Sequence, residues 1–273
     1  MRAVGRWLAV ALLASAAGGG VVGAQTVVLQ IRPRVGDTLH LRYDQRVEMT
    51  GTGWGDTAAT TMVNTLMVFS RTVPTDTDAS GTDVVAITDS VASAPESAEL
   101  AERMLKGKPL RLWIARDGAT SLAPSDSAGV SPELRAAFAG IPAILPSGRV
   151  KVGRSWTRDV VLPGSGSAGT LRATFRLDSL TRSGDSAFVS LRGTLRHRVV
   201  KTDVGTGSGG GAASMSGVVT GAMVVDRRRG WVSDSRATFT VNSVVSPPKG
   251  GARGAAPVRV RMTITEWMRT TDR

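Results

Sequence analysis

Hydrophobic and polar residues alternate along residues 231–245, and this is the clearest structural signal in the chain. The apolar residues on its odd positions are Trp231, Ala237, Phe239, Val241 and Val245. A period of two is typical of a β-strand with one dry and one solvated face. A second apolar run, 218–225, precedes it, and a short basic turn at 226–230 joins the two. We therefore predict a β-hairpin centred on this turn.

The same alternation recurs along the chain, at residues 38–49, 170–180 and 258–269. Each of these segments is expected to be a strand with one wet face, which favours antiparallel pairing. Further strands are predicted at 26–32, 58–73, 83–91, 110–115, 154–162 and 186–201. Part of segment 58–73 is apolar on both registers, as expected of a strand that is covered on both sides.

Two segments carry helix signals. Pro95 suits the first position and Gly107 the C-terminal cap of an amphipathic helix over 95–106. Ser131 suits the N-cap of a second, short helix over 131–138. The expected fold is mainly β, with a curved antiparallel sheet or incomplete β-barrel and one or two covering helices.

The first residues predict export. Arg2 and Arg6 precede an apolar run at 7–17, and small residues end at Ala24, as in a secretory signal peptide over 1–24. The alternative is a buried N-terminal helix, but the run is too short to span a bilayer and Gly18, Gly19 and Gly20 would break a helix, so we favour export. After cleavage the protein is expected in the periplasm or outside the cell, with no transmembrane anchor.

Residues 25–273 suit a single β-rich domain, or two half-domains that meet near 146–152. The sequences Val-Gly-Asp-Thr-Leu at 35–39 and Val-Gly-Arg-Ser-Trp at 152–156 share a pattern at the start of a strand. Either an internal duplication or the independent use of the same residue types in similar turns explains the shared pattern, and we favour the second explanation.

The charge is basic and uneven, with a formal net charge of +12. Residues 25–145 carry 11 basic and 14 acidic side chains, whereas residues 146–273 carry 21 and 8. The basic half suits an acidic lipid, glycan or protein surface, with Arg227, Arg228 and Arg229 as candidate contacts. The alternative is that scattered arginines only solvate the wet strand faces.

No stretch of the chain carries a strong chemical motif. Gly-rich residues 164–169 and 205–210 have dinucleotide-loop spacing, but neither opens a helix. Residues 76–81 begin like a calcium loop, yet Ile87 stands where an EF-hand has Glu, so a polar turn is expected. The lack of cysteine excludes disulfides, thiolate metal sites and cysteine nucleophiles. We expect no cofactor and no metal.

The chain has two histidines, His40 and His197. Asp44 follows His40 on the same strand face at about 13 Å, which is too far for a direct pair. We expect a protein that is not an enzyme, with a Ser/His/Asp site assembled from distant segments as the alternative. Nucleic-acid binding is not expected, because aromatic residues are few and are not interleaved with the basic ones.

The strand layout, the strand-Asp-x-x-x-Gly-strand pattern at 224–231 and the Val-Gly-Arg-Ser-Trp stretch carry a resemblance. The chain resembles exported bacterial domains of uncharacterised function with half-barrels like those of the LolA/LppX lipoprotein carriers. The resemblance implies a concave face that holds lipid acyl chains under helical cover, and it supplies no catalytic residues.

We therefore expect a non-enzymatic binding protein that holds a hydrophobic or lipid-like ligand on the concave face of the sheet. The candidate lining residues are Met62, Leu66, Val68, Phe239 and Val241, with Leu100 and Met104 in a lid. The alternatives are an ordinary closed core for all seven, and an envelope interaction protein that uses its basic half.

Overall fold

The computed structural model describes residues 25–52, 58–94, 106–123, 143–161, 170–202, 211–246 and 257–271. The described chain consists of strands and their connections, which confirms the mainly β prediction. The strands are β1 (Thr26–Val28), β2 (Leu39–Thr52), β3 (Ala59–Thr77), β4 (Gly81–Ala94), β5 (Pro109–Ala115), β6 (Thr120–Leu122), β7 (Arg149–Lys151), β8 (Ser155–Val161), β9 (Thr170–Leu180), β10 (Ser186–Thr202), β11 (Gly211–Asp226), β12 (Trp231–Val245) and β13 (Val258–Thr271). The signal-peptide segment and the two predicted helices, apart from Lys106, lie outside the described residues.

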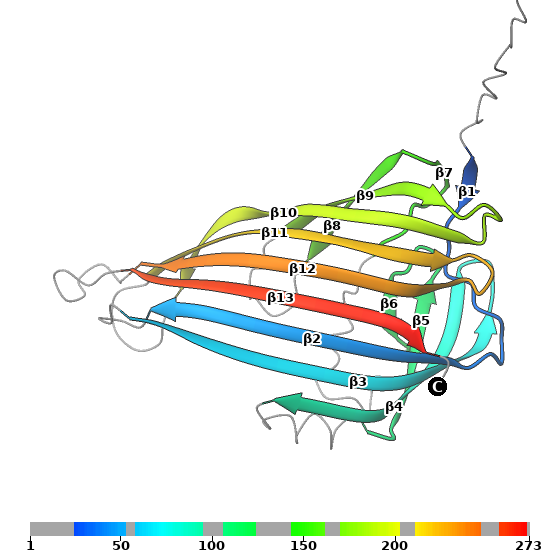
Figure 1. The fold of residues 1–273 in the computed structure, drawn as a ribbon, viewed down its shortest axis with the longest axis horizontal. Helices are drawn as coiled ribbons and strands as arrows, with labels where there is room; N and C mark the ends of the chain where they lie inside the picture. The colour runs from blue at the N-terminus through cyan, green and yellow to red at the C-terminus, as the bar shows by residue number, and fades with distance from the viewer. Residues whose placement is uncertain are drawn as a thin grey trace, which may run out of the picture.

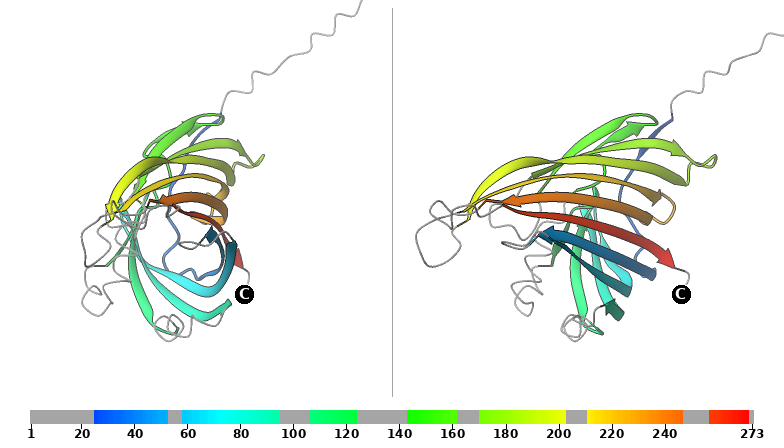
Figure 2. Two further views of the ribbon diagram at one scale, coloured as in Figure 1. Left: turned by 90° about the vertical axis from the view of Figure 1, so that its left-hand side faces the viewer. Right: turned by 60° about the vertical axis from the view of Figure 1, so that its left-hand side comes forward.

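Eleven strands form one antiparallel sheet, in the order β6-β5-β4-β3-β2-β13-β12-β11-β10-β9-β8. The short strands β1 and β7 pair with each other in a separate two-stranded sheet. Within the larger sheet, β2 to β6 pair in sequence order, β8 to β13 do the same, and the last strand, β13, pairs with β2 (Figure 1). The sheet is therefore an up-and-down meander that curls around without closing, because β6 and β8 remain its edges (Figure 2). Both halves of the chain contribute to this one sheet.

Cross-strand pairs show which side chains share a face of the sheet. The paired residues can be followed across the sheet from Phe175 of β9, over β10, β11 and β12, to Glu266 of β13. From Glu266 the pairing continues to Gln45 of β2 and then to Leu66 of β3. Directly paired residues point to the same side, so these residues all lie on one face. That face includes the buried apolar positions of β9, so it is the concave face, and the opposite face is the outer one.

One end of the curled sheet is filled by a packed core. The segment after β1 crosses this end, where the Ile31 N–H donates to the Arg116 carbonyl and the Arg32 N–H to the Gly230 carbonyl, each at 2.8 Å. Leu29 on this segment is almost completely buried. The core joins β5 on one side to β9 on the other, and its most buried apolar residues are Leu29, Val84, Leu145, Leu177, Ala187, Val189 and Val225. We call this the plugged end.

Small residues allow the sheet to curl. Gly193, Gly217 and Gly221 share the concave face of β10 and β11. A Cβ atom added at Gly221 would lie 2.5 Å from the carbonyl oxygen of Arg236 on the adjacent strand. Glycine in a strand interior often marks such close approach of a neighbouring backbone. Without side chains here, the strands approach more closely on the concave side than a flat sheet would permit.

The predicted hairpin at 218–245 is present, but its register is interrupted. The pairing of β11 with β12 shifts between Val224 and Val225, so Val232 lies opposite the buried Val225. Trp231 was expected to share a face with Phe239, whereas the shift separates their registers. Trp231 is nevertheless buried in the core of the plugged end.

Two similar turns open the two meanders, β2–β6 and β8–β13. Gly36 and Gly153 have φ angles of 85° and 83°, which glycine adopts without strain. In each turn the next residue donates its N–H to a carbonyl three positions back, at 3.2 Å for Asp37 and 3.0 Å for Arg154. The repeated Val-Gly pattern therefore corresponds to the same turn geometry at both places.

Candidate binding surfaces of the sheet

The concave face beyond the plugged end carries a row of methionines. Met62 of β3 is paired with Met49 of β2, which is paired with Met262 of β13. We call these three residues the methionine rung. Met62 is 58% exposed and Met49 36% exposed, although both point into the curve of the sheet. Met49 and Met62 are thus accessible, whereas Leu195 and Leu171, which continue the same row on β10 and β9, are buried.

The five described residues predicted to line a ligand all lie on the concave face. Met62, Leu66 and Val68 come from β3, and Phe239 and Val241 come from β12. The last two pack against a small buried cluster of Leu171, Leu195 and Val219. Leu100 and Met104, the predicted lid residues, lie outside the described residues.

Phe239 and Val241 therefore fit the closed-core alternative better than Met62 does. Sequence analysis did not select Met49 or Met262, although both fall on apolar registers. Only the pairing of β2 with both β3 and β13 brings them beside Met62.

A polar cluster interrupts the apolar concave face between the methionine rung and the plugged end. The Gln45 Nε2 atom donates to the Tyr43 hydroxyl at 2.9 Å and to Glu266 Oε1 at 3.1 Å. Burial of the phenol raises the pKa of Tyr43 well above its ordinary value, and the charge of Glu266 raises it further. Tyr43 is thus held as a neutral phenol beside a carboxylate.

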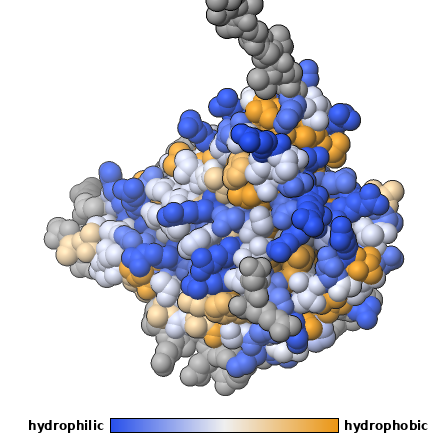
Figure 3. All heavy atoms as spheres, turned by 45° about the vertical axis from the view of Figure 1, so that its right-hand side comes forward, coloured by the Kyte–Doolittle hydropathy of each residue, from blue (hydrophilic) through white to orange (hydrophobic). Residues whose placement is uncertain are grey.

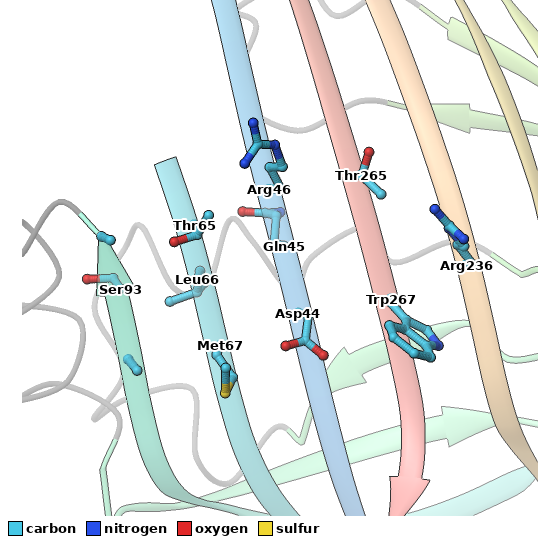
Figure 4. A pocket seen from close by; sticks show the side chains of 12 residues that line it. Asp44, Gln45, Arg46, Thr65, Leu66, Met67, Ser93, Arg236, Thr265 and Trp267 are labelled. Carbon is cyan, nitrogen blue, oxygen red and sulfur yellow. The ribbon is translucent and has the colours of Figure 1, made fainter. Parts of the chain in front are cut away.

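An open groove of about 540 Å³ crosses the outer face of β4, β3, β2, β13 and β12 (Figure 4). Its side chains include Trp267, which donates its indole N–H to Asp234 at 3.2 Å and carries the Arg269 guanidinium 4.3 Å from its ring centre. The lining residues on the outer register are Asp44, Arg46, Thr65, Met67, Ala92, Ala94, Arg236, Thr265 and Trp267. Gln45, Leu66 and Ser93 also border the groove, although their register places their side chains on the concave face. The aromatic ring and arginines of this groove were not selected by sequence analysis, because their adjacency depends on strand pairing.

The three arginines of the hairpin turn are not equivalent. The Arg227 guanidinium donates to the carbonyl of Gly184 in the β9–β10 turn. Arg229 lies 3.9 Å from Asp226, and that carboxylate also accepts the N–H groups of Arg228 and Arg229. Two of the three predicted contacts are therefore already engaged within the turns.

Four other arginines are more available to a partner. Each is exposed on the outer face of β10, β12 or β13, and none has a hydrogen bond or ion pair within the described part of the chain. They are Arg192, Arg236, Arg259 and Arg261. The surface in Figure 3 is largely hydrophilic, with apolar residues scattered over it. The outer face thus differs from the concave one in both charge and polarity.

The calcium-like segment forms the turn between β3 and β4. Asp78 Oδ1 accepts the N–H of Ser80 at 2.6 Å and that of Gly81 at 3.0 Å. Its hydrogen bonds with Ser80, followed by that with Gly81, lower the pKa of Asp78. This carboxylate therefore stabilises the polar turn.

The two histidines, which were considered as possible catalytic residues, are separated in space. His40 lies at the plugged end beside Asp37 and Arg229, and His197 lies in β10 where the pairing with β11 shifts. Across the described ranges, acidic residues and histidines form no cluster of three suited to a metal ion. The same ranges contain no helix long and apolar enough to cross a membrane.

Comparison with protein families gives a match over part of the chain. A family of unknown function, DUF6263, matches residues 131–232, a segment that includes β7 to β11 and reaches the first residues of β12. No curated protein matches the chain. Over this segment, well under half of its length, the chain is therefore similar to a family whose function is not assigned.

Proposed function

We propose that this protein is an exported, non-enzymatic binding protein that holds a hydrophobic or lipid-like ligand on the concave face of its sheet. The methionine rung is the observation that carries the proposal. Met49 and Met62 are large apolar side chains on the inner side of a curled sheet, yet each is at least one third exposed.

The chemistry of methionine suits this role. Its unbranched, polarisable side chain adapts to ligands of different shape. Covering exposed apolar surface is favourable by about 25 cal/mol per Å². An acyl chain lying along the concave face would bury the rung against Leu66 and Val68, which share that face. The plugged end limits how far such a chain could extend.

The likeness to LolA/LppX-type half-barrels supports the same proposal. The resemblance implies a ligand on the concave face of such a sheet, and the sheet of this chain is likewise antiparallel and not closed into a barrel. Export is part of the proposal because of the charged, apolar and small-residue order in residues 1–24.

The test compares two aspartate substitutions on neighbouring residues of β3. Met62 lies on the concave face, whereas Val63 is 38% exposed and lies on the outer face. Met62→Asp should weaken binding of a fluorescent fatty-acid analogue by about tenfold or more, because an unpaired charge in an apolar site is costly. Val63→Asp should bind as the wild type does.

Native mass spectrometry of the purified wild type should also detect a copurified lipid. A wild-type protein that is empty and binds no analogue would refute the proposal. So would equal loss of binding in Met62→Asp and Val63→Asp.

A second candidate function is binding to an acidic surface through the outer face. The four exposed arginines on β10, β12 and β13 favour it, because no acidic side chain pairs with them in the described chain. Such binding would weaken steeply as salt is added, whereas lipid binding on the concave face would not. Salt dependence therefore separates the two functions.

A further inference from the structure

The polar cluster of Tyr43, Gln45 and Glu266 lies inside the face proposed to bind a ligand. Gln45 and Glu266 are directly opposite on β2 and β13, and Tyr43 is two residues from Gln45 on the same side of β2. The next residues along this row are apolar, Leu66 on β3 and Ala237 on β12. The cluster is therefore a polar island on an apolar surface.

Glu266 has unused capacity to accept hydrogen bonds. Within the described chain it accepts one hydrogen bond, from Gln45 at 3.1 Å, and the phenol of Tyr43 is the other polar group of the cluster. An ionised carboxylate can accept about four hydrogen bonds. Glu266 forms no ion pair with any described residue, and its side chain is only partly buried.

The surroundings of the carboxylate favour a cationic partner. Apolar neighbours reduce the local dielectric constant and strengthen attraction between opposite charges. On the same face of β13, Glu266 is flanked by Ile264 and Met268, so its neighbours along the strand are apolar. The free energy cost of partly desolvating Glu266 is already incurred when the sheet folds.

We propose that Glu266, positioned by Gln45 and Tyr43, selects hydrophobic ligands that carry a protonated amine. This inference rests on the proposed function and specifies the ligand class. Gln45 and Met49 lie four residues apart on β2, which is about 13 Å along a strand. An amine on Glu266 would therefore leave its alkyl chain free to run along the strands to the methionine rung.

Three ligands with the same decyl chain test the proposal: decylamine, decanol and decanoate, each kept below its micellar concentration. Wild-type protein should bind decylamine about tenfold or more tightly than decanol, since a charge-assisted hydrogen bond is stronger than a neutral one. Decanoate should bind most weakly. Calorimetric titration measures the three affinities.

Glu266→Gln should remove the preference for decylamine while leaving the affinity for decanol unchanged. The matched control is Glu48→Gln, which makes the same change of charge on the outer face of β2, where Glu48 pairs with Arg46. The control should keep the wild-type preference. The comparison of ligands on wild-type protein does not depend on how either variant folds.

The outcomes separate the two proposals. If no decyl compound binds, the proposed function itself is wrong. If all three bind with equal affinity, or if Glu266→Gln retains the preference for the amine, the ligand class is wrong while hydrophobic binding stands.

Discussion

The close approach of strands at Gly221 makes a prediction that can be tested by a single added methyl group. In Gly221→Ala the new Cβ would lie 2.5 Å from the Arg236 carbonyl oxygen and 3.1 Å from the Ala237 Cα. Real Cβ atoms essentially never come closer than 3.0 Å to such atoms, so the strands would have to separate by at least 0.5 Å. Both obstacles are backbone atoms, which cannot rotate away as a flexible side chain can.

The expected change in the free energy of unfolding of Gly221→Ala is the sum of two opposing contributions. Overpacking of this kind costs about 1–3 kcal/mol, whereas replacing a strand glycine by alanine stabilises by about 0.5–1 kcal/mol. We expect a net loss of about 1–2 kcal/mol in the free energy of unfolding. For a protein of this size, that corresponds to a Tm lower by about 2–8 °C.

Gly148→Ala is the matched control for this substitution. A Cβ at Gly148 meets nothing within 4 Å, and Gly148 is not among the glycines with positive φ. Thermal unfolding followed by circular dichroism should therefore leave the control unchanged or slightly stabilised. If Gly221→Ala unfolds at the same temperature as Gly148→Ala, the account of close strand approach on the concave face is wrong.

The remaining predictions concern a buried phenol and the outer arginines. Tyr43 is the sole tyrosine of the chain, so tyrosinate absorbance reports on it alone. Because its folded pKa is raised by burial, its contribution to stability is complete below the unfolded value and is lost as the pH rises above that value. At about pH 11, the native protein should show little tyrosinate and the urea-unfolded protein much more, and equal signals would contradict this burial. In the second test, Arg236→Glu combined with Arg261→Glu should weaken binding to anionic phosphatidylglycerol vesicles by roughly tenfold or more. Lys108→Glu, on the connection between β4 and β5, is the charge-reversal control, and vesicle binding unaffected by the double reversal would exclude the outer face as an acidic-surface site.

The secondary structure was largely determined by the sequence. The alternation of apolar and polar residues in β9, β12 and β13 is a local property of the chain, because side chains of a strand point to opposite sides in turn. The turns at Gly36 and Gly153 were likewise visible as Val-Gly patterns, since few other residues adopt their backbone angles. The basic turn was found, although two of its arginines are engaged locally.

Only the tertiary structure decided which apolar residues are core and which are accessible. Leu177 and Met62 lie on equally apolar registers, yet Leu177 is fully buried at the plugged end and Met62 is 58% exposed. That difference arises from the segment around Leu29, which covers one end of the sheet, and from the pairing of β2 with β13, which joins the chain's two halves. Glu266 and Gln45 are 221 residues apart in sequence and were not selected together, because their contact requires this closure. Local periodicity is encoded within each strand, whereas the concave face exists only once distant strands are paired.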